Sequence, residues 1–239
     1  MGKSGQEGIE DFQEAFARIE AALDAGDADL GKLGYWRLLR QVKAEAPLSH
    51  HWADDIGRID RKAFERRIRV RFPVWLGNTV LIAGLALGAV GVVVARRAND
   101  ELLAGIALVA AAVAWSVSVH CLAHWLVGRI GRIRFTAYFF KRELPPRPGL
   151  KTDYATYLRA APLSRAWMHA AGALATKVAP FVALAFFPGS RAPAWAGWTL
   201  LGIGLLQLFT DVRYSTKVGD WKKVRRELMV ARSQLTRGR

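Results

Sequence analysis

The chain has 239 residues, 52% of them hydrophobic, and carries a formal net charge of +15. Soluble globular proteins rarely combine so much apolar composition with so large a positive excess, whereas membrane spans with basic flanking loops do. The excess lies between and after the apolar segments and accompanies no nucleic-acid-binding motif, so nucleic acid is not expected as a partner.

The N-terminal region predicts a cytoplasmic helical hairpin over residues 1–46. Apolar residues recur at helical spacing in two runs separated by a glycine-containing break: Phe12, Phe16, Ile19 and Leu23, then Leu33, Trp36, Leu39 and Val42. Pro47 ends the pattern, and residues 47–71 form a basic juxtamembrane segment.

Four apolar segments follow, in a predicted membrane domain over residues 72–211. A helix needs about 20 apolar residues to cross a bilayer, and this length is reached at 72–95, 102–128, 167–187 and 192–210. We therefore expect an all-α membrane protein with four transmembrane helices.

The charged regions set the expected orientation. The segment before the first span, the connection 129–166 and the tail 212–239 are all basic, and an even number of spans puts them on one side. Basic loops face the cytoplasm, so both termini are expected there, in the cell membrane. The tail predicts an amphipathic helix that rests on anionic headgroups with one apolar face, made of Val218, Trp221, Val224 and Leu228.

Polar residues inside spans are expensive and mark functional sites. His120 and His124 are four residues apart on the second span, so their imidazoles share one helix face and can bind one metal ion. Asp211, at the same end of the fourth span, is the expected third ligand, and His169 is the next candidate. Imidazole and carboxylate donors favour zinc.

Other interpretations of these residues stay open. Two interfacial histidines can be amphipathic rings at headgroup depth, and Asp211 can pair with Arg213, Lys217 or Lys177. A b-type haem held by His120 or His124 with His169 is a less favoured alternative. The main alternative function, ahead of haem binding, is a non-enzymatic membrane scaffold or adaptor that binds partners and anionic lipid.

Residues 120–134 resemble the site-2 protease family of intramembrane zinc metalloproteases, which carry His-Glu-x-x-His on a span. The β-prone stretch 133–140 is similar to that family's membrane-dipping sheet, and residues 171–176 are similar to its Ala-Gly-Pro-Leu-x-Asn motif. The resemblance implies a zinc site at His120, His124 and Asp211, and a membrane-protein substrate or partner.

The chain departs from the family pattern at three places. Cys121 stands where the family has its catalytic glutamate, Ala173 and Thr176 replace Pro and Asn, and Thr210-Asp211-Val212 replaces Leu-Asp-Gly. Loss of a general base typically lowers the rate by about 10²- to 10⁴-fold. Glu143 or Asp153 could substitute. The sequence thus indicates either a divergent metalloprotease or a catalytically silent relative.

Overall fold

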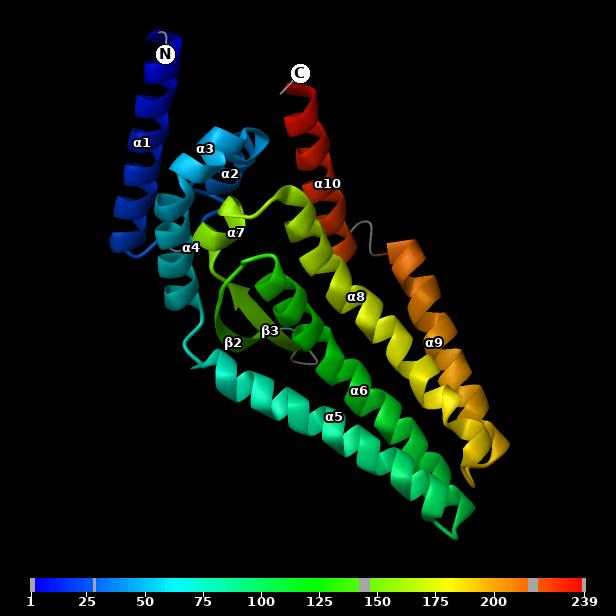
Figure 1. Cartoon of the computed structure of the whole chain (residues 1–239). Coiled ribbons are helices and arrows are strands. Elements are labelled where there is room, and N and C mark those ends of the chain that lie inside the picture. The colour runs from blue at the N-terminus through cyan, green and yellow to red at the C-terminus, as the bar shows by residue number, and fades with distance from the viewer. Residues whose placement is uncertain (1–2, 28, 142–146, 215–218, 238–239) are drawn as a thin grey trace.

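The computed structural model describes residues 3–27, 29–141, 147–214 and 219–237. Figure 1 shows a long helical bundle with a group of shorter helices at one end. The helices are α1 (Lys3–Asp24), α2 (Tyr35–Ala44), α3 (Ala46–His51), α4 (Ala53–Arg67), α5 (Val74–Arg97), α6 (Glu101–Ile130), α7 (Tyr154–Arg159), α8 (Pro162–Ala185), the 3₁₀ turn η1 (Phe187–Gly189), α9 (Ala194–Tyr214) and α10 (Asp220–Arg237).

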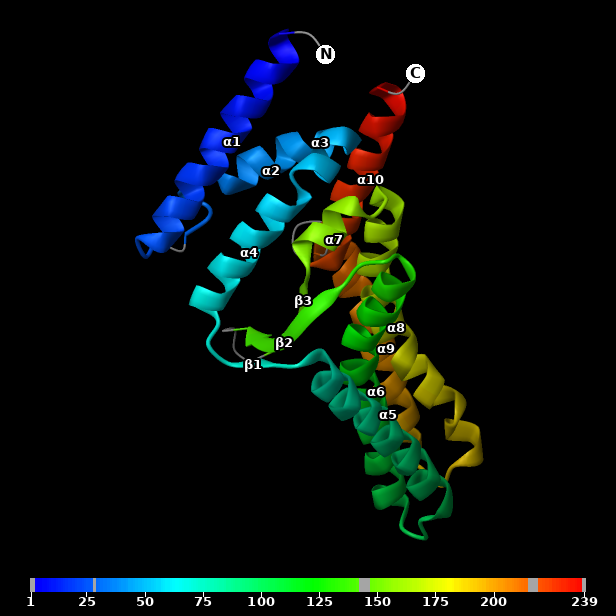
Figure 2. The ribbon, with the colours of Figure 1, turned by 60° about the vertical axis from the view of Figure 1, so that its left-hand side comes forward.

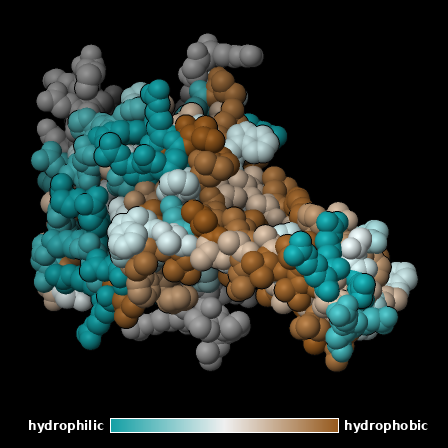
Figure 3. Space-filling view, turned by 60° about the horizontal axis from the view of Figure 1, so that its bottom comes forward, coloured by the Kyte–Doolittle hydropathy of each residue, from teal (hydrophilic) through white to brown (hydrophobic). Residues whose placement is uncertain are grey.

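Three helices of the described chain are long and apolar enough to cross a membrane. They are α5, α6 and Pro162–Gly189, which is α8 continued through η1. Large apolar side chains on these helices point outward, as Val80, Leu87 and Val117 do. Figure 3 shows this hydrophobic surface between two hydrophilic regions. α9 occupies the fourth predicted segment and is not among the three.

Helices α5 and α6 pack closely because small residues of α5 face large or polar residues of α6. A Cβ added at Gly88 would overlap the indole of Trp115, and one at Gly84 would overlap Ser118. The Trp115 Nε1–H donates to the Leu85 carbonyl at 3.0 Å. Small residues that bring backbones together are the usual means of helix association in membranes.

The short helices at the other end share one hydrophobic core. The predicted helices are present as α1 and α2, and their apolar residues pack with those of α3, α4 and α7. Trp36 was expected on the buried face of α2, but its side chain is 46% exposed. Pro47 lies in the first turn of α3, and the segment that follows contains α4. The region before the first span is therefore a folded group of helices, which Figure 2 shows spread out.

A small antiparallel sheet is the exception to the helical fold. It consists of β1 (Arg71–Phe72), β2 (Phe135–Lys141) and β3 (Arg147–Thr152), in the order β1-β2-β3. β2 confirms the strand expected within 133–140, and it pairs Tyr138 with Leu150 of β3. The Tyr138 hydroxyl donates to Asn78 of α5 at 2.9 Å, which attaches the sheet to the bundle.

Helix α10 begins within a few residues of the predicted start of the amphipathic helix, but its inner face packs on α8. Val224 is buried against Ala166 and Ala170 of α8, and Trp221 packs on the same cluster. The expectation that this face rests on lipid headgroups is therefore wrong for Trp221 and Val224, because α8 covers them. Val218 lies outside the described residues.

Candidate metal site

His120 and His124 lie on successive turns of α6 and face α8. Their ring centroids are 4.7 Å apart, and the His124 side chain is 13% exposed. Gly172 of α8 makes this approach possible, since a Cβ there would overlap the His124 ring. The i, i+4 spacing thus produces the shared face that the sequence predicts.

Each imidazole uses its Nδ1 atom to bind α8. His124 Nδ1 lies 2.6 Å from the Met168 carbonyl oxygen, and His120 Nδ1 lies 3.1 Å from that of Gly172. A carbonyl oxygen only accepts hydrogen bonds, so both Nδ1 atoms carry the proton. In the neutral rings the Nε2 atoms then present lone pairs. Histidine ligands of metals are oriented in this way by backbone carbonyls.

The two Nε2 atoms converge on one carboxylate, that of Asp220. Its Oδ2 atom lies 3.3 Å from His124 Nε2 and 3.5 Å from His120 Nε2. Tetrahedral zinc with ligand bonds of about 2.0–2.2 Å separates its donor atoms by roughly 3.3–3.6 Å. The three side chains therefore have the spacing of a metal-binding group, and all their donor atoms lie within 4.8 Å of one another.

The Asp220 carboxylate is kept ionised by its neighbours. Burial raises its pKa, but the neighbouring His124 side chain and the Lys223 ammonium outweigh this effect, so the pKa of Asp220 is lowered. Lys223 Nζ lies 2.9 Å from the other oxygen, Oδ1. Asp220 can thus accept from Lys223 and still offer Oδ2 to a cation.

Asp211, the aspartate that the sequence favours as third ligand, lies in a different pair. Lys177 Nζ is 3.2 Å from its Oδ2 atom, and Trp221 Nε1–H donates to the same oxygen at 2.7 Å. The structure brings Asp220 rather than Asp211 to the histidines. The Lys177 pairing is the alternative that the sequence leaves open for Asp211.

Asp220 owes its position to the packing of α10 on α8, which the order of the spans does not reveal. α9 ends at Tyr214, and α10 begins at Asp220 and continues in the same direction as α9, toward the start of α8. Gly219 has φ of +98°, a left-handed conformation that glycine adopts without strain. In the sequence, the only local indication of the position of Asp220 is a glycine–aspartate pair at the start of a basic helix.

His169, the next candidate, lies near the group but in another network. The Tyr157 hydroxyl donates to Glu227 at 2.8 Å, so at 3.0 Å it accepts from His169 Nε2–H. The neighbouring cavity measures about 200 Å³. This is below the roughly 300–1,000 Å³ of pockets that hold drug-sized ligands, so the haem alternative is not supported.

That cavity lies between the histidines and β3, and its lining includes Cys121, Pro148 and His169. Cys121 Sγ is 3.9 Å from the Pro148 carbonyl oxygen. Of the carboxylates in the described residues, Asp220 alone lines the cavity. Asp153 instead caps α7, and Glu143 lies outside the described residues.

No known protein-family model, curated protein or solved structure matches this chain.

Proposed function

We propose that the chain is a multi-pass membrane protein that binds one zinc ion through His120, His124 and Asp220. The observation that supports this proposal is the direction of the two imidazoles. Each donates Nδ1–H to α8 and turns its Nε2 lone pair toward the same Asp220 oxygen. Three electron-rich atoms this close repel one another unless a cation lies among them. A proton can join one nitrogen to the carboxylate, whereas a metal ion satisfies all three atoms.

Zinc fits the donor set better than magnesium or calcium, which prefer six or more oxygen ligands. Three protein ligands leave one tetrahedral position, and the cavity beside the group offers room for water or a substrate group. Catalytic zinc sites share this arrangement, which supports a divergent relative of the site-2 protease family.

We further propose that the protein binds zinc but has no peptidase activity. A metallopeptidase needs a second carboxylate to accept and return a proton. Cys121 stands at that place, and the described lining of the cavity holds no carboxylate besides Asp220. Asp220 itself is needed as a ligand.

We also propose four spans with both termini in the cytoplasm, because this topology agrees with the packing of α10 on α8. α10 contacts α8, whose first turns lie beside the short helices, so the chain must return across the bundle in α9. At 1.5 Å per residue the 21 residues of α9 extend about 31 Å, close to the thickness of the hydrocarbon core. The basic side of this arrangement would face anionic headgroups of the cell membrane.

Zinc content tests the proposal directly. The protein, purified in lipid nanodiscs and equilibrated with zinc, should hold about one equivalent. The Asp220→Asn and His124→Ala variants should lose it, because each removes a ligand. Asp211→Asn is the matched control, since it makes the same change in a carboxylate paired with Lys177. Retention of zinc in Asp220→Asn, or its loss only in Asp211→Asn, would refute the assignment.

Peptidase activity is tested separately with a single-span membrane substrate. Wild-type protein loaded with zinc should not cleave it, whereas cleavage that disappears in His124→Ala would show that proteolysis survives without the glutamate. Cys121→Glu restores the family pattern and tests whether this position alone accounts for the lack of peptidase activity. Protein that binds no zinc would favour the scaffold alternative.

A further inference from the structure

A cleft of about 820 Å³ lies between α2 and α10, away from the metal group. Trp36 of α2 and Met229 of α10 stand at its rims, 46% and 53% exposed. Leu39 lies deeper and is 5% exposed, and Val230 is half-buried. The cleft thus has an apolar floor and two large exposed apolar rims, from elements far apart in the sequence.

The charged groups around this cleft are all positive. Arg40 and Arg226 line it and are exposed, and within the described part of the chain neither forms an ion pair or hydrogen bond. Lys43 also lines the cleft, but its ammonium is bound to Glu227. No carboxylate is among the described lining residues.

A neutral donor lies in the same lining. Tyr154 of α7 faces the cleft, and the described residues offer its hydroxyl no hydrogen-bond partner. Two guanidinium groups and a phenol hydroxyl beside an apolar floor suit a ligand with one anionic head and an apolar body. A guanidinium binds a carboxylate through two parallel hydrogen bonds.

We propose that this cleft binds a long-chain fatty acid, with its carboxylate on Arg226 and Arg40 and its chain across Trp36 and Met229. The volume lies within the range of small-molecule pockets, about 300–1,000 Å³. An acidic helix from a partner fits less well, because helix recognition needs apolar contacts repeated over several turns. α2 has only 10 residues and offers one exposed apolar side chain, Trp36, to the cleft.

Photocrosslinking tests this binding. The full-length protein in nanodiscs is incubated with palmitate that carries a diazirine on its chain, irradiated and digested, and labelled peptides are identified by mass spectrometry. Labels are expected on α2 and α10 as well as on the lipid-facing spans. Unlabelled palmitate should compete for the α2 and α10 labels, whereas hexadecanol, which lacks the charge, should not.

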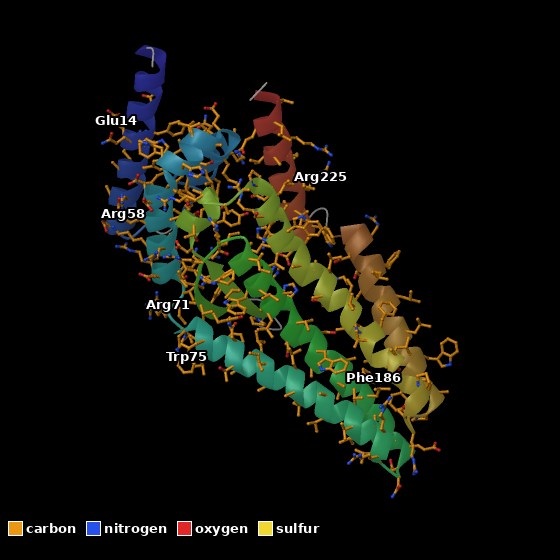
Figure 4. The ribbon with its side chains drawn as sticks, in the orientation of Figure 1. Glu14, Arg58, Arg71, Trp75, Phe186 and Arg225 are labelled. Carbon is orange, nitrogen blue, oxygen red and sulfur yellow. The ribbon has the colours of Figure 1, made fainter. Side chains whose placement is uncertain are left out.

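Charge-reversal variants supply the control. Arg226→Glu should weaken labelling of α2 and α10 about tenfold, the usual loss when a charge-assisted hydrogen bond is removed. Arg40→Glu, on α2 at the opposite wall of the cleft, should weaken the labelling in the same way. Arg225→Glu makes the same change on the side of α10 turned away from α2, as Figure 4 shows, and should have no effect.

The proposal would be overturned by labels confined to the spans, by equal loss in Arg225→Glu and Arg226→Glu, or by equal competition from hexadecanol. Displacement of the label by an acidic amphipathic peptide but not by palmitate would also overturn it, in favour of a protein partner. Circular dichroism and the zinc content of each variant show that the fold is retained.

Discussion

His120 and His124 each use one ring nitrogen to bind α8 and leave the other for a ligand. The helix-to-helix hydrogen bonds fix the tautomer, and the tautomer fixes which atoms can bind a metal. Asp211 and Asp220 differ in the groups that face their carboxylates. Asp211 pairs with Lys177, whereas Asp220 faces two imidazole nitrogens. One aspartate therefore neutralises a lysine within the bundle, and the other is available to a metal ion.

A single methyl group at Gly172 should test the geometry of the pair. Gly172→Ala places a Cβ on the His124 ring and moves it away from Asp220. We expect zinc affinity to fall about 10- to 100-fold, the usual effect of changes in the shell that supports the ligands. Isothermal titration with zinc in nanodiscs measures the affinity.

Gly202→Ala on α9 is the matched control, because an added Cβ there meets nothing within 4 Å. Both substitutions raise helix propensity by about 1 kcal/mol, so propensity alone cannot separate them. Equal zinc affinity in the two variants would contradict the proposed contact between Gly172 and His124.

Among the elements, α10 has an inner face of unusual composition. Asp220, Val224 and Glu227 follow the i, i+4, i+7 spacing of one helix face, so two acids flank an apolar residue in an otherwise basic helix. Glu227 is 2% exposed and binds Arg165 of α8 and Lys43 of α2. α10 thereby joins the metal group, the start of α8 and the N-terminal helices.

Removing the Glu227 carboxylate should detach α10. Glu227→Ala leaves Arg165 and Lys43 buried without their counter-charge, a loss that typically costs about 3–5 kcal/mol. We expect faster hydrogen exchange throughout α10 and a lower midpoint of thermal unfolding. Hydrogen exchange with mass spectrometry and scanning calorimetry measure the two effects.

Glu65→Ala makes the same change in an exposed pair with Arg71, whose side chains are 50% and 37% exposed. Such pairs contribute less than about 1 kcal/mol, so this variant should behave as wild type. Unaltered exchange of α10 in Glu227→Ala would show that other contacts hold the helix in place.

Across the whole molecule, the features predictable from the sequence are those determined by local composition. Apolar runs of about 20 residues predict α5, α6 and α8 within a few residues, and aromatic and β-branched residues predict β2. β1 has only two residues and pairs through Arg71 and Phe72 with β2, a contact that local pattern cannot reveal.

Of the candidate site, the two histidines are predictable from the sequence and the aspartate is not. Its histidines share one helix face, which is a property of spacing. Its aspartate is 96 positions from His124 and reaches it because α10 packs on the first half of α8. Matching residues by depth in the membrane favours Asp211, because Asp211 ends the fourth apolar run and Asp220 does not belong to a run.

The four-span arrangement predicts which loops share a side. Single cysteines at Asn99 and Ser190, introduced on a Cys121→Ala background, should both react with a membrane-impermeant maleimide added to intact cells. A cysteine at Arg232 should react only after permeabilisation. Because α5–α6 and α8–α9 are connected at the same end of the bundle in Figure 1, labelling of Asn99 and Ser190 from opposite sides would exclude four spans.

The central claim is that His120, His124 and Asp220 hold one zinc ion. Crystals of the full chain grown with zinc, measured on both sides of the zinc absorption edge, test it most directly. We predict one anomalous difference peak at about 2.0–2.2 Å from both Nε2 atoms and from an Asp220 carboxylate oxygen. A peak beside Asp211, or no peak at the histidines in zinc-saturated crystals, would contradict it.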